Sequence, residues 1–399
     1  MKAIYVFSVL MLMIAGCGRT ELNDLIVVSG IGIDRSGEGM LMHFQVINPS
    51  GTAASQSGAP SGGSGGPVYT YSFEGENASE ILQKAKNTIS RKLYFSHVST
   101  IVVSERFAAE EGLLPVLEFT ERFYQMRRNV NFLIAKDSDS SSILKMYTPI
   151  QKMPALSLES RIPNTKSSMG FRAGITLKYI LKWFANPHQE PFIFGVEKQQ
   201  NQKAASKTED LSSIDGNPNS FTITGLALFK KDKLVDWLTY DESRSLGLMK
   251  GLVSGPSVYT IDCPNAKSGS IILVAQHMKG SLSYVKADVP SFQTRIRIKG
   301  FVQEASCSKS LDNSGQIKQI EKLAEKKISG ELQAVFEKVK DNSTDSFGLR
   351  RIIFEADPSL FKKWEPRWEE LYQEARLSTD VTFTIENTGL RMKSMYEDN

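Results

Sequence analysis

Residues 25–33 read Leu-Ile-Val-Val-Ser-Gly-Ile-Gly-Ile, an apolar run rich in β-branched side chains that is typical of a strand. The segment Gly30-Ile31-Gly32 lacks the third glycine of a dinucleotide-binding loop. A second strand-like run, residues 40–48, follows where that loop would open a helix. Residues 35–39, Arg-Ser-Gly-Glu-Gly, have the composition of a hairpin turn. We therefore expect two strands joined by a turn, with the glycines as points of close packing.

The residues that follow alternate between strand and helix patterns. Residues 50–66 are rich in glycine and serine, and we expect a mobile loop because they offer no apolar area to bury. Beyond them we expect a strand, a helix, a strand, a helix and a strand, in that order, at residues 68–73, 78–90, 99–103, 113–124 and 131–135. This order predicts a mixed sheet with packed helices, which we assign to an N-terminal mixed α/β domain over residues 25–149.

The second half of the chain has a different pattern. Residues 150–196 predict a middle helical segment or small domain, and the polar residues 197–216 predict a linker. Residues 217–399 contain a hairpin, alternating strands, a closing strand and a long amphipathic helix at residues 316–340. They predict a C-terminal α+β domain. The whole chain is expected to be α+β, with mixed and antiparallel sheets and packed helices.

The N-terminus has the features of an export signal. Lys2 supplies a positive charge, residues 3–15 are almost entirely apolar, and small residues lead into Cys17. The apolar run is too short to span a bilayer comfortably, because a spanning helix needs about 20 apolar residues. We expect a signal peptide over residues 1–16.

The end of the signal carries a more specific motif. Ile14-Ala15-Gly16-Cys17 resembles the bacterial lipobox, in which the peptide is cut just before the cysteine and the thiol takes a diacylglyceryl group. We expect cleavage after Gly16, an N-palmitoyl, S-diacylglycerol cysteine at Cys17 and a lipidated tether over residues 17–24. Each buried methylene of an acyl chain contributes about 0.8 kcal/mol to membrane binding. The alternative is an ordinary signal peptide with a chance cysteine.

The composition argues against two classes of protein. Hydrophobic residues make up 41% of the 399 residues and charged residues 23%, which is ordinary for a folded soluble body. No second apolar run reaches spanning length, so we expect a peripheral rather than an integral membrane protein. The net charge of +4 argues against nucleic acid as the main partner. A weak attraction to anionic lipid headgroups stays open.

Two cysteines remain if Cys17 is lipidated. An exported setting permits a disulfide between Cys263 and Cys307. Two buried free thiols are equally compatible with the sequence, because sequence does not supply the geometry that a disulfide requires.

No catalytic motif is present. The sequence contains no P-loop, G-x-S-x-G, H-E-x-x-H or C-x-x-C. His43, His188 and His277 are scattered along the chain without ligand spacing, so no zinc site is supported. Acidic pairs such as Glu369-Glu370 belong to a charged helix face. We expect no catalysis, no metal and no cofactor other than the covalent lipid.

Several short blocks together resemble one family. In order they are the lipobox at Cys17, Arg19-Thr20-Glu21-Leu22-Asn23-Asp24-Leu25, Gly32-Ile33-Asp34, Gln45-Val46-Ile47-Asn48-Pro49, Ser90-Arg91-Lys92-Leu93-Tyr94-Phe95-Ser96-His97, Thr148-Pro149, Met153-Pro154-Ala155-Leu156, residues 225–235, Phe347-Gly348, Trp364 and Trp368. The chain resembles the Ger(x)C lipoproteins, the C subunits of bacterial spore germinant receptors. The resemblance runs nearly end to end.

The resemblance implies a fold, a location and partners. It implies a three-domain mixed α/β lipoprotein on the outer face of the spore inner membrane. There the chain would assemble with an A subunit and an integral B subunit into a receptor that responds to nutrients. It implies no catalysis.

The block around His97 is the most specific of these motifs. Arg91, Lys92, Tyr94 and His97 are candidates for a contact surface with the partner subunits. The alternative is a turn into a strand, in which Tyr94 and Phe95 anchor the core and His97 is hydrogen-bonded.

A second function from another class stays open. In this alternative, the chain is a lipid-anchored extracytoplasmic solute-binding protein that captures a small nutrient. That function predicts two lobes of alternating strands and helices around a cleft. The antiparallel runs of the C-terminal half argue against it.

Overall fold

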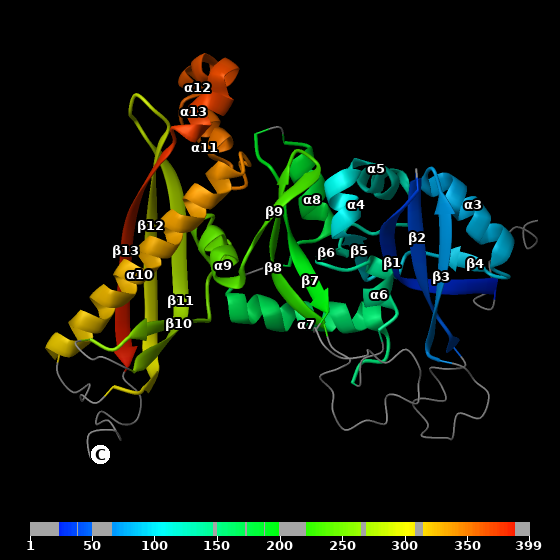
Figure 1. Ribbon diagram of the computed structural model, residues 1–399, viewed down its shortest axis with the longest axis horizontal. Coiled ribbons are helices and arrows are strands. Elements are labelled where there is room, and N and C mark those ends of the chain that lie inside the picture. Colours follow the sequence, from blue (N-terminus) through cyan, green and yellow to red (C-terminus); the bar gives the residue numbers. More distant parts are fainter. Residues whose placement is uncertain are drawn as a thin grey trace, which may run out of the picture.

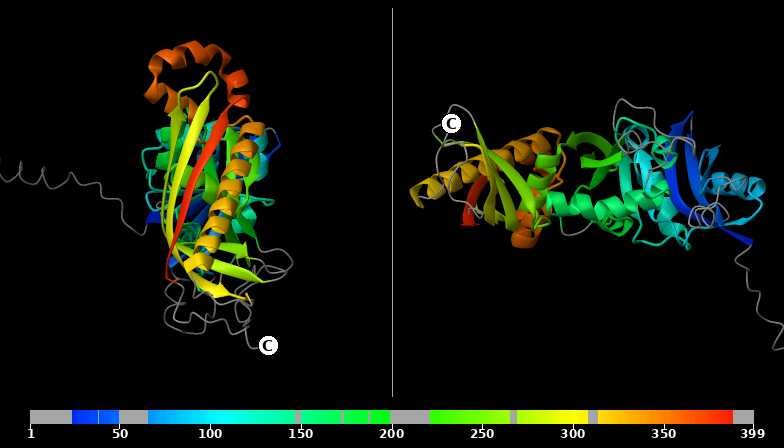
Figure 2. Two further views of the ribbon diagram at one scale, coloured as in Figure 1. Left: turned by 90° about the vertical axis from the view of Figure 1, so that its left-hand side faces the viewer. Right: turned by 90° about the horizontal axis from the view of Figure 1, so that it is seen from below.

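The computed structural model describes residues 24–37, 39–49, 66–146, 150–171, 174–186, 188–198, 221–264, 269–307 and 314–387. The expected signal peptide, Cys17, nearly all of the tether, the Gly/Ser-rich loop up to residue 65 and the linker from residue 199 lie outside the described residues. Two sheets follow one another along the longest axis of the molecule (Figure 1, Figure 2). The expected α+β fold is confirmed.

The larger sheet has nine strands within the described residues, in the order β3-β2-β1-β5-β6-β7-β8-β9, with β4 paired to β1. The central strands β1, β5, β6 and β7 run parallel, and the neighbours at both ends pair antiparallel. The strands are β1 (Leu25–Ser36), β2 (Gly39–Ile47), β3 (Val68–Gly75), β4 (Lys92–Tyr94), β5 (Thr100–Ser104), β6 (Asn131–Ala135), β7 (Phe192–Lys198), β8 (Phe221–Lys230) and β9 (Lys233–Leu238).

The first hairpin forms as expected, and its glycines are points of close packing. A Cβ atom at Gly30 would lie 2.7 Å from the Cβ of Ala155, and one at Gly32 would lie 2.6 Å from Ser140 Oγ. Distances this short leave no room for a side chain. The two glycines therefore let two helices approach the backbone of β1.

Helices pack on both faces of this sheet (Figure 1). They are α3 (Ala78–Thr88), α4 (Glu105–Glu110), α5 (Leu114–Arg122), α6 (Ser140–Leu144), α7 (Pro154–Met169) and α8 (Leu177–Phe184). Asn77 caps the start of α3, since its side chain accepts from the backbone N–H of Glu80, and the helix buries Ile81 and Ala85. Helix α7 forms in a segment without clear apolar periodicity, and its apolar residues Ala155 and Leu158 are buried.

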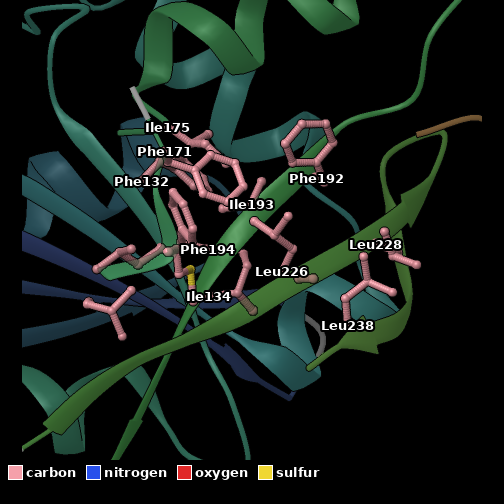
Figure 3. Packing of buried hydrophobic residues seen from close by; sticks show 14 of the residues in the cluster. Phe132, Ile134, Phe171, Ile175, Phe192, Ile193, Phe194, Leu226, Leu228 and Leu238 are labelled. Carbon is pink, nitrogen blue, oxygen red and sulfur yellow. The ribbon is translucent and has the colours of Figure 1, made fainter. Parts of the chain in front are cut away.

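Apolar side chains of β6, β7 and β8 pack together in the core of the larger sheet. Figure 3 shows Phe132, Phe171 and Phe194 gathered on one side of β7. The rings of Phe171 and Phe194 lie 5.2 Å apart and edge to face, an arrangement that aromatic quadrupoles favour. Leu226 on β8 is also fully buried. The parallel strands β6 and β7 are apolar on both faces because both faces are covered.

The larger sheet extends past the expected boundary near residue 217. Strand β7 lies before that position and β8 after it, yet Phe192 pairs with Leu228 and Phe194 with Leu226. Strand β9 then pairs with β8. Residues 221–238 therefore complete the first sheet instead of starting the second, because pairing with β8 satisfies the backbone groups along an open edge of β7.

The smaller sheet has the order β10-β11-β12-β13 within the described residues, with β13 parallel to β12. Its strands are β10 (Ser257–Asp262), β11 (Ser270–Val285), β12 (Ser291–Ala305) and β13 (Arg376–Asn387), and α9 (Tyr240–Met249) connects it to the larger sheet. Strand β11 is one continuous strand of 16 residues. Its pairing with β12 continues past a bulge near His277 and through Gly280.

One long helix covers this smaller sheet. Helix α10 (Ser314–Asp341) lies beside β13 (Figure 2) and buries the stripe Ile320, Ala324, Ile328, Leu332, Val335, Phe336 and Val339. The helices α11 (Leu349–Ala356), α12 (Pro358–Trp364) and α13 (Trp368–Gln373) gather at one end of the sheet. The helix expected at residues 316–340 is confirmed.

Candidate functional site

The candidate contact residues lie in and beside β4, the short strand that pairs with the beginning of β1. Arg91, Lys92 and His97 are exposed, and Tyr94 is half-buried with its ring 5.6 Å from the ring of His97. Phe95 is buried and anchors this segment, with its ring 5.0 Å from that of Phe123. The structure thus combines an apolar anchor with exposed cations, and the contact role stays a prediction.

The two remaining cysteines are joined. A disulfide links Cys263, just after β10, to Cys307, just after β12, with Cα atoms 5.7 Å apart. Both residues are buried. The bond closes a span of 44 residues that contains the whole β11–β12 hairpin.

A polar chain that sequence reasoning missed crosses β1, β2 and β3, with Asp34 and His43 buried and Ser72 exposed. His43 Nε2 lies 2.9 Å from Asp34 Oδ2, and His43 Nδ1 lies 2.7 Å from Ser72 Oγ. The Asp34 carboxylate also accepts from the backbone N–H groups of Ser140 and Ser141. Strand pairing explains the contact, since His43 stands opposite Ser72 and two residues from Leu41, the partner of Asp34, on the same face of the sheet.

This chain of Ser72, His43 and Asp34 has the residue types of a hydrolase triad. Its geometry points to a structural role. The two cavities described below are lined by other residues, and the Asp34 carboxylate holds the first turn of α6. Burial raises the pKa of Asp34, but hydrogen bonds from His43 and Ser140 outweigh it and lower that pKa below 3.8.

The other histidines are not brought together. His188 packs between Phe354 and Phe361, with both ring centroids 5.0 Å away, and His277 is exposed on β11. In the described ranges, no group of three or more histidine, cysteine, aspartate or glutamate side chains has the arrangement of a metal site. None of the helices in the same ranges is both long and apolar enough to cross a bilayer.

A cavity of about 840 Å³ lies where the two sheets meet. The end of α8, the turn between β8 and β9 and the helices α11 and α13 contribute to its walls. Its aromatic residues include Trp183, Trp368 and Tyr372, and its carboxylates include Glu190 and Asp345. Its size is in the range of small-molecule sites in proteins. A second, smaller cavity of about 400 Å³ lies between α3 and α5.

Glu190 ties the two sheets together beside this cavity. Its Oε1 accepts from the backbone N–H of Lys231 at 3.0 Å, in the β8–β9 turn, and its Oε2 accepts from the backbone N–H of Asp345 at 2.6 Å. The Asp345 carboxylate in turn accepts from the backbone N–H groups of Leu349 and Arg350 at the start of α11. Residues from three distant parts of the chain meet at these two carboxylates.

The Lys250 side chain lies close to the same carboxylates. Burial lowers the pKa of Lys250 while the charge of Asp345 opposes that shift, and burial raises the pKa of Asp345. The Lys250 ammonium donates to the carbonyl of Phe347 at 2.7 Å. Nothing in the sequence pattern predicted this junction, because Glu190, Lys250 and Asp345 are 60 or more positions apart.

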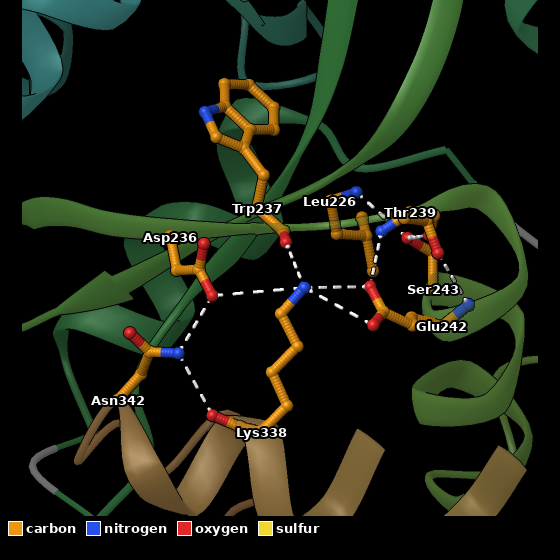
Figure 4. A network of polar contacts seen from close by, with 8 residues as sticks. All are labelled: Leu226, Asp236, Trp237, Thr239, Glu242, Ser243, Lys338 and Asn342. Carbon is orange, nitrogen blue, oxygen red and sulfur yellow. Dashed lines mark hydrogen bonds and ion pairs between the residues drawn. The ribbon is translucent and has the colours of Figure 1, made fainter. Parts of the chain in front are cut away.

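A second polar cluster joins α10 to the larger sheet (Figure 4). The Lys338 ammonium donates to the carbonyl of Trp237 at 2.9 Å and to Glu242 Oε2 at 3.0 Å. Asn342 donates to Asp236 Oδ2 at 2.8 Å. The helix that covers the smaller sheet is therefore also bound to β9 and α9 of the neighbouring unit.

Comparisons with known proteins find similarity along most of the chain. The family model described as "Spore germination protein N-terminal domain" matches residues 18–198, and the one described as "Spore germination B3/GerAC like, C-terminal" matches residues 224–389. Spore germination protein KC of Bacillus subtilis is 29% identical over 98% of both chains. Spore germination protein GerQC of Bacillus cereus is 24% identical over 98% of this chain and 99% of its own length.

A solved structure has the same fold. The crystal structure of the GerBC protein superposes with a TM-score of 0.57 at 17% identity, and the match covers 90% of this chain and 97% of that one. Both family models match in order, and the matched relatives are covered almost completely. The chain therefore belongs to the Ger(x)C family of spore germination proteins.

Proposed function

We propose that this chain is a lipid-anchored, non-catalytic subunit of a nutrient germinant receptor complex at the spore inner membrane. The observation that carries the proposal is the match of both spore germination family models, in order, along residues 18–198 and 224–389. A chain that keeps the complete architecture of its relatives is expected to keep their kind of role. Its partners in this proposal are the A and B subunits.

The anchor in this proposal is Cys17. The segment Ile14-Ala15-Gly16-Cys17 has the lipobox pattern, and the N-terminal family match begins at the next residue, Gly18. With diacylglyceryl and palmitoyl groups the cysteine would hold the body on the outer face of the membrane, since two or more acyl chains anchor firmly.

The test uses spores that lack the gene, complemented with wild type, Cys17→Ala or Ser8→Ala. The last change lies inside the apolar run of the signal and serves as the matched control. We expect wild type and Ser8→Ala to incorporate a labelled palmitate, to stay in the membrane fraction and to restore the response to one nutrient class. Cys17→Ala is expected to lose the label and most of the response. Full response and membrane retention of an unlabelled Cys17→Ala chain would contradict the anchor.

Membership in the complex needs a separate measurement. The detergent-solubilised chain is expected to co-purify with its integral partner from spores. Recovery of the chain alone, from membranes in which the partner is present, would contradict the proposed assembly.

The cavity of about 840 Å³ between the sheets favours a second candidate, capture of a small nutrient. It predicts that the isolated body binds a nutrient directly, as measured by calorimetry. An isolated body that binds none of the nutrients to which the spores respond leaves the receptor-subunit proposal in place and removes the solute-binding one.

A further inference from the structure

The first described strand fixes where the chain enters the folded body. Strand β1 begins at Leu25, which pairs in parallel with Lys92 of β4. The strands β5 and β6 run parallel to β1. The N-terminal ends of β1, β5 and β6 therefore lie together along the same edge of the larger sheet, the edge at which these strands begin. Any anchor that precedes Leu25 is therefore attached at this edge.

Two loops and a helix start meet at this edge. The Phe95 N–H donates to Gln125 Oε1 at 3.5 Å, and the Asn131 N–H donates to the carbonyl of Ser99 at 3.0 Å, so the loop before β5 lies against the loop before β6. The Lys178 N–H donates to the carbonyl of Arg128 at 2.9 Å, which adds the start of α8. These contacts make one continuous surface.

Basic side chains dominate this surface. We call it the basic edge, and its exposed members are Arg91, Lys92, His97, Arg127, Arg128, Lys178 and Lys182. The acidic groups beside them are Asp24 at the start of β1 and Glu121, whose carboxylate lies 3.9 Å from Arg128. These two carboxylates offset two of the six lysine and arginine charges, so the basic edge keeps a net positive charge.

Exposed aromatic rings accompany the charges. The side chain of Tyr124 is 87% exposed although its neighbour Phe123 packs on Phe95, and Tyr179 on α8 is also exposed. Tyrosine beside lysine and arginine is the combination that membrane interfaces favour, because the ring sits among the headgroups while the cations meet the phosphates.

The length of the tether brings this edge to the bilayer. Eight steps of chain separate Cys17 from Leu25, and an extended chain spans at most about 3.5 Å per residue, so Leu25 lies within roughly 28 Å of the anchored cysteine. We propose that the basic edge docks on anionic lipid headgroups beside the anchor and so sets the orientation of the body on the membrane. This inference rests on the proposed lipid anchor at Cys17.

The test removes the anchor and measures the edge alone. The chain over residues 17–399 carrying Cys17→Ala is floated with vesicles of phosphatidylcholine alone or mixed with phosphatidylglycerol, at low and at high salt. We expect binding only to the anionic vesicles and only at low salt. Reversing Arg91, Lys92, Arg127 and Arg128 to glutamate is expected to weaken that binding by at least about 100-fold, since each cation near an anionic surface contributes roughly fivefold.

The matched control reverses four exposed cations elsewhere, Lys279, Arg295, Lys362 and Lys363, and changes the net charge by the same amount. This control is expected to bind almost as wild type does. Equal losses in both variants would show an effect of net charge alone and would overturn the proposal, as would absence of binding to anionic vesicles. Thermal melting of both variants confirms that each is folded.

A protein partner at the same edge is the competing outcome. In spores, the lipidated variant with the four reversals at the basic edge is expected to keep its integral partner. Loss of that partner, together with unchanged vesicle binding, would assign the edge to a subunit contact instead. The vesicle assay uses a chain without the covalent lipid on Cys17. It therefore stays informative even if the palmitate label on Cys17 fails to appear.

Discussion

At the scale of single residues, Asp34 shows how one buried carboxylate organises several segments. It contacts His43 on β2 and the backbone N–H groups at the start of α6, and it is almost completely buried. A buried charge is tolerated only when hydrogen bonds replace its water, which these three donors do. The hydrogen bonds also stabilise the ionised form, which is why they lower the pKa of Asp34 despite burial.

Asp34→Asn is expected to lower the free energy of unfolding by roughly 2 kcal/mol at pH 7, because the charged acceptor is lost. The pKa of Asp34 in the folded chain lies below the unfolded value of 3.8. Its stabilisation is therefore complete above that pH and is lost as the pH falls towards the folded pKa. Urea unfolding at pH 7 and at pH 3 measures this. A difference between variant and wild type that is as large at pH 3 as at pH 7 would contradict the role of the charge.

At the scale of elements, two helices contain an interior glycine for different reasons. A Cβ atom at Gly330 in α10 would meet no atom within 4 Å, so packing does not require glycine there. A Cβ atom at Gly247 in α9 would lie 2.5 Å from the ring of Phe171 and 2.8 Å from Val253. The apolar stripe of α10 predicted its existence and its buried face, but no local pattern distinguishes these two glycines.

The two substitutions to alanine should have opposite signs. Gly330→Ala is expected to raise the free energy of unfolding by about 0.5–1 kcal/mol, because alanine restricts the unfolded chain and favours helix. Gly247→Ala is expected to lower it by about 1–3 kcal/mol, because the methyl group overpacks the contact with Phe171. Chemical denaturation of each variant provides the measurement. Two changes of equal sign would show that α9 and α10 are not packed as described.

At the scale of the whole molecule, the junction between the two sheets depends on a few polar groups. Glu190 accepts hydrogen bonds from the β8–β9 turn and from Asp345. The Lys338 ammonium of α10 donates hydrogen bonds to Trp237 and Glu242. The cavity of about 840 Å³ lies beside the first of these contacts. Relative movement of the two sheets would have to break these hydrogen bonds.

Glu190→Ala is expected to loosen this junction, since it leaves the backbone N–H groups of Lys231 and Asp345 without their acceptor. We expect faster hydrogen exchange at both amides and a loss of roughly 2 kcal/mol in the free energy of unfolding. Glu369→Ala, at an exposed position of the same cavity, is the control and should change neither. Unchanged exchange at Asp345 in Glu190→Ala would show that the junction does not depend on this carboxylate.

The sequence by itself determined the elements whose signal is local. The first hairpin, the alternation of β12 and the apolar stripe of α10 follow from periodicities of two and 3.6 residues, which neighbouring side chains display directly. The family resemblance was likewise carried by short blocks in a constant order, and the comparisons confirm it.

Only the tertiary structure decided what depends on pairing across distance. The parallel neighbours β1, β5 and β6, the completion of the first sheet by residues 221–238 and the meeting of Glu190 with Asp345 join segments far apart in the chain. So does the contact between the loops that form the basic edge. The strand patterns are compatible with several partners, and the choice among them is made by the edges left open and the apolar faces left uncovered when the whole chain packs.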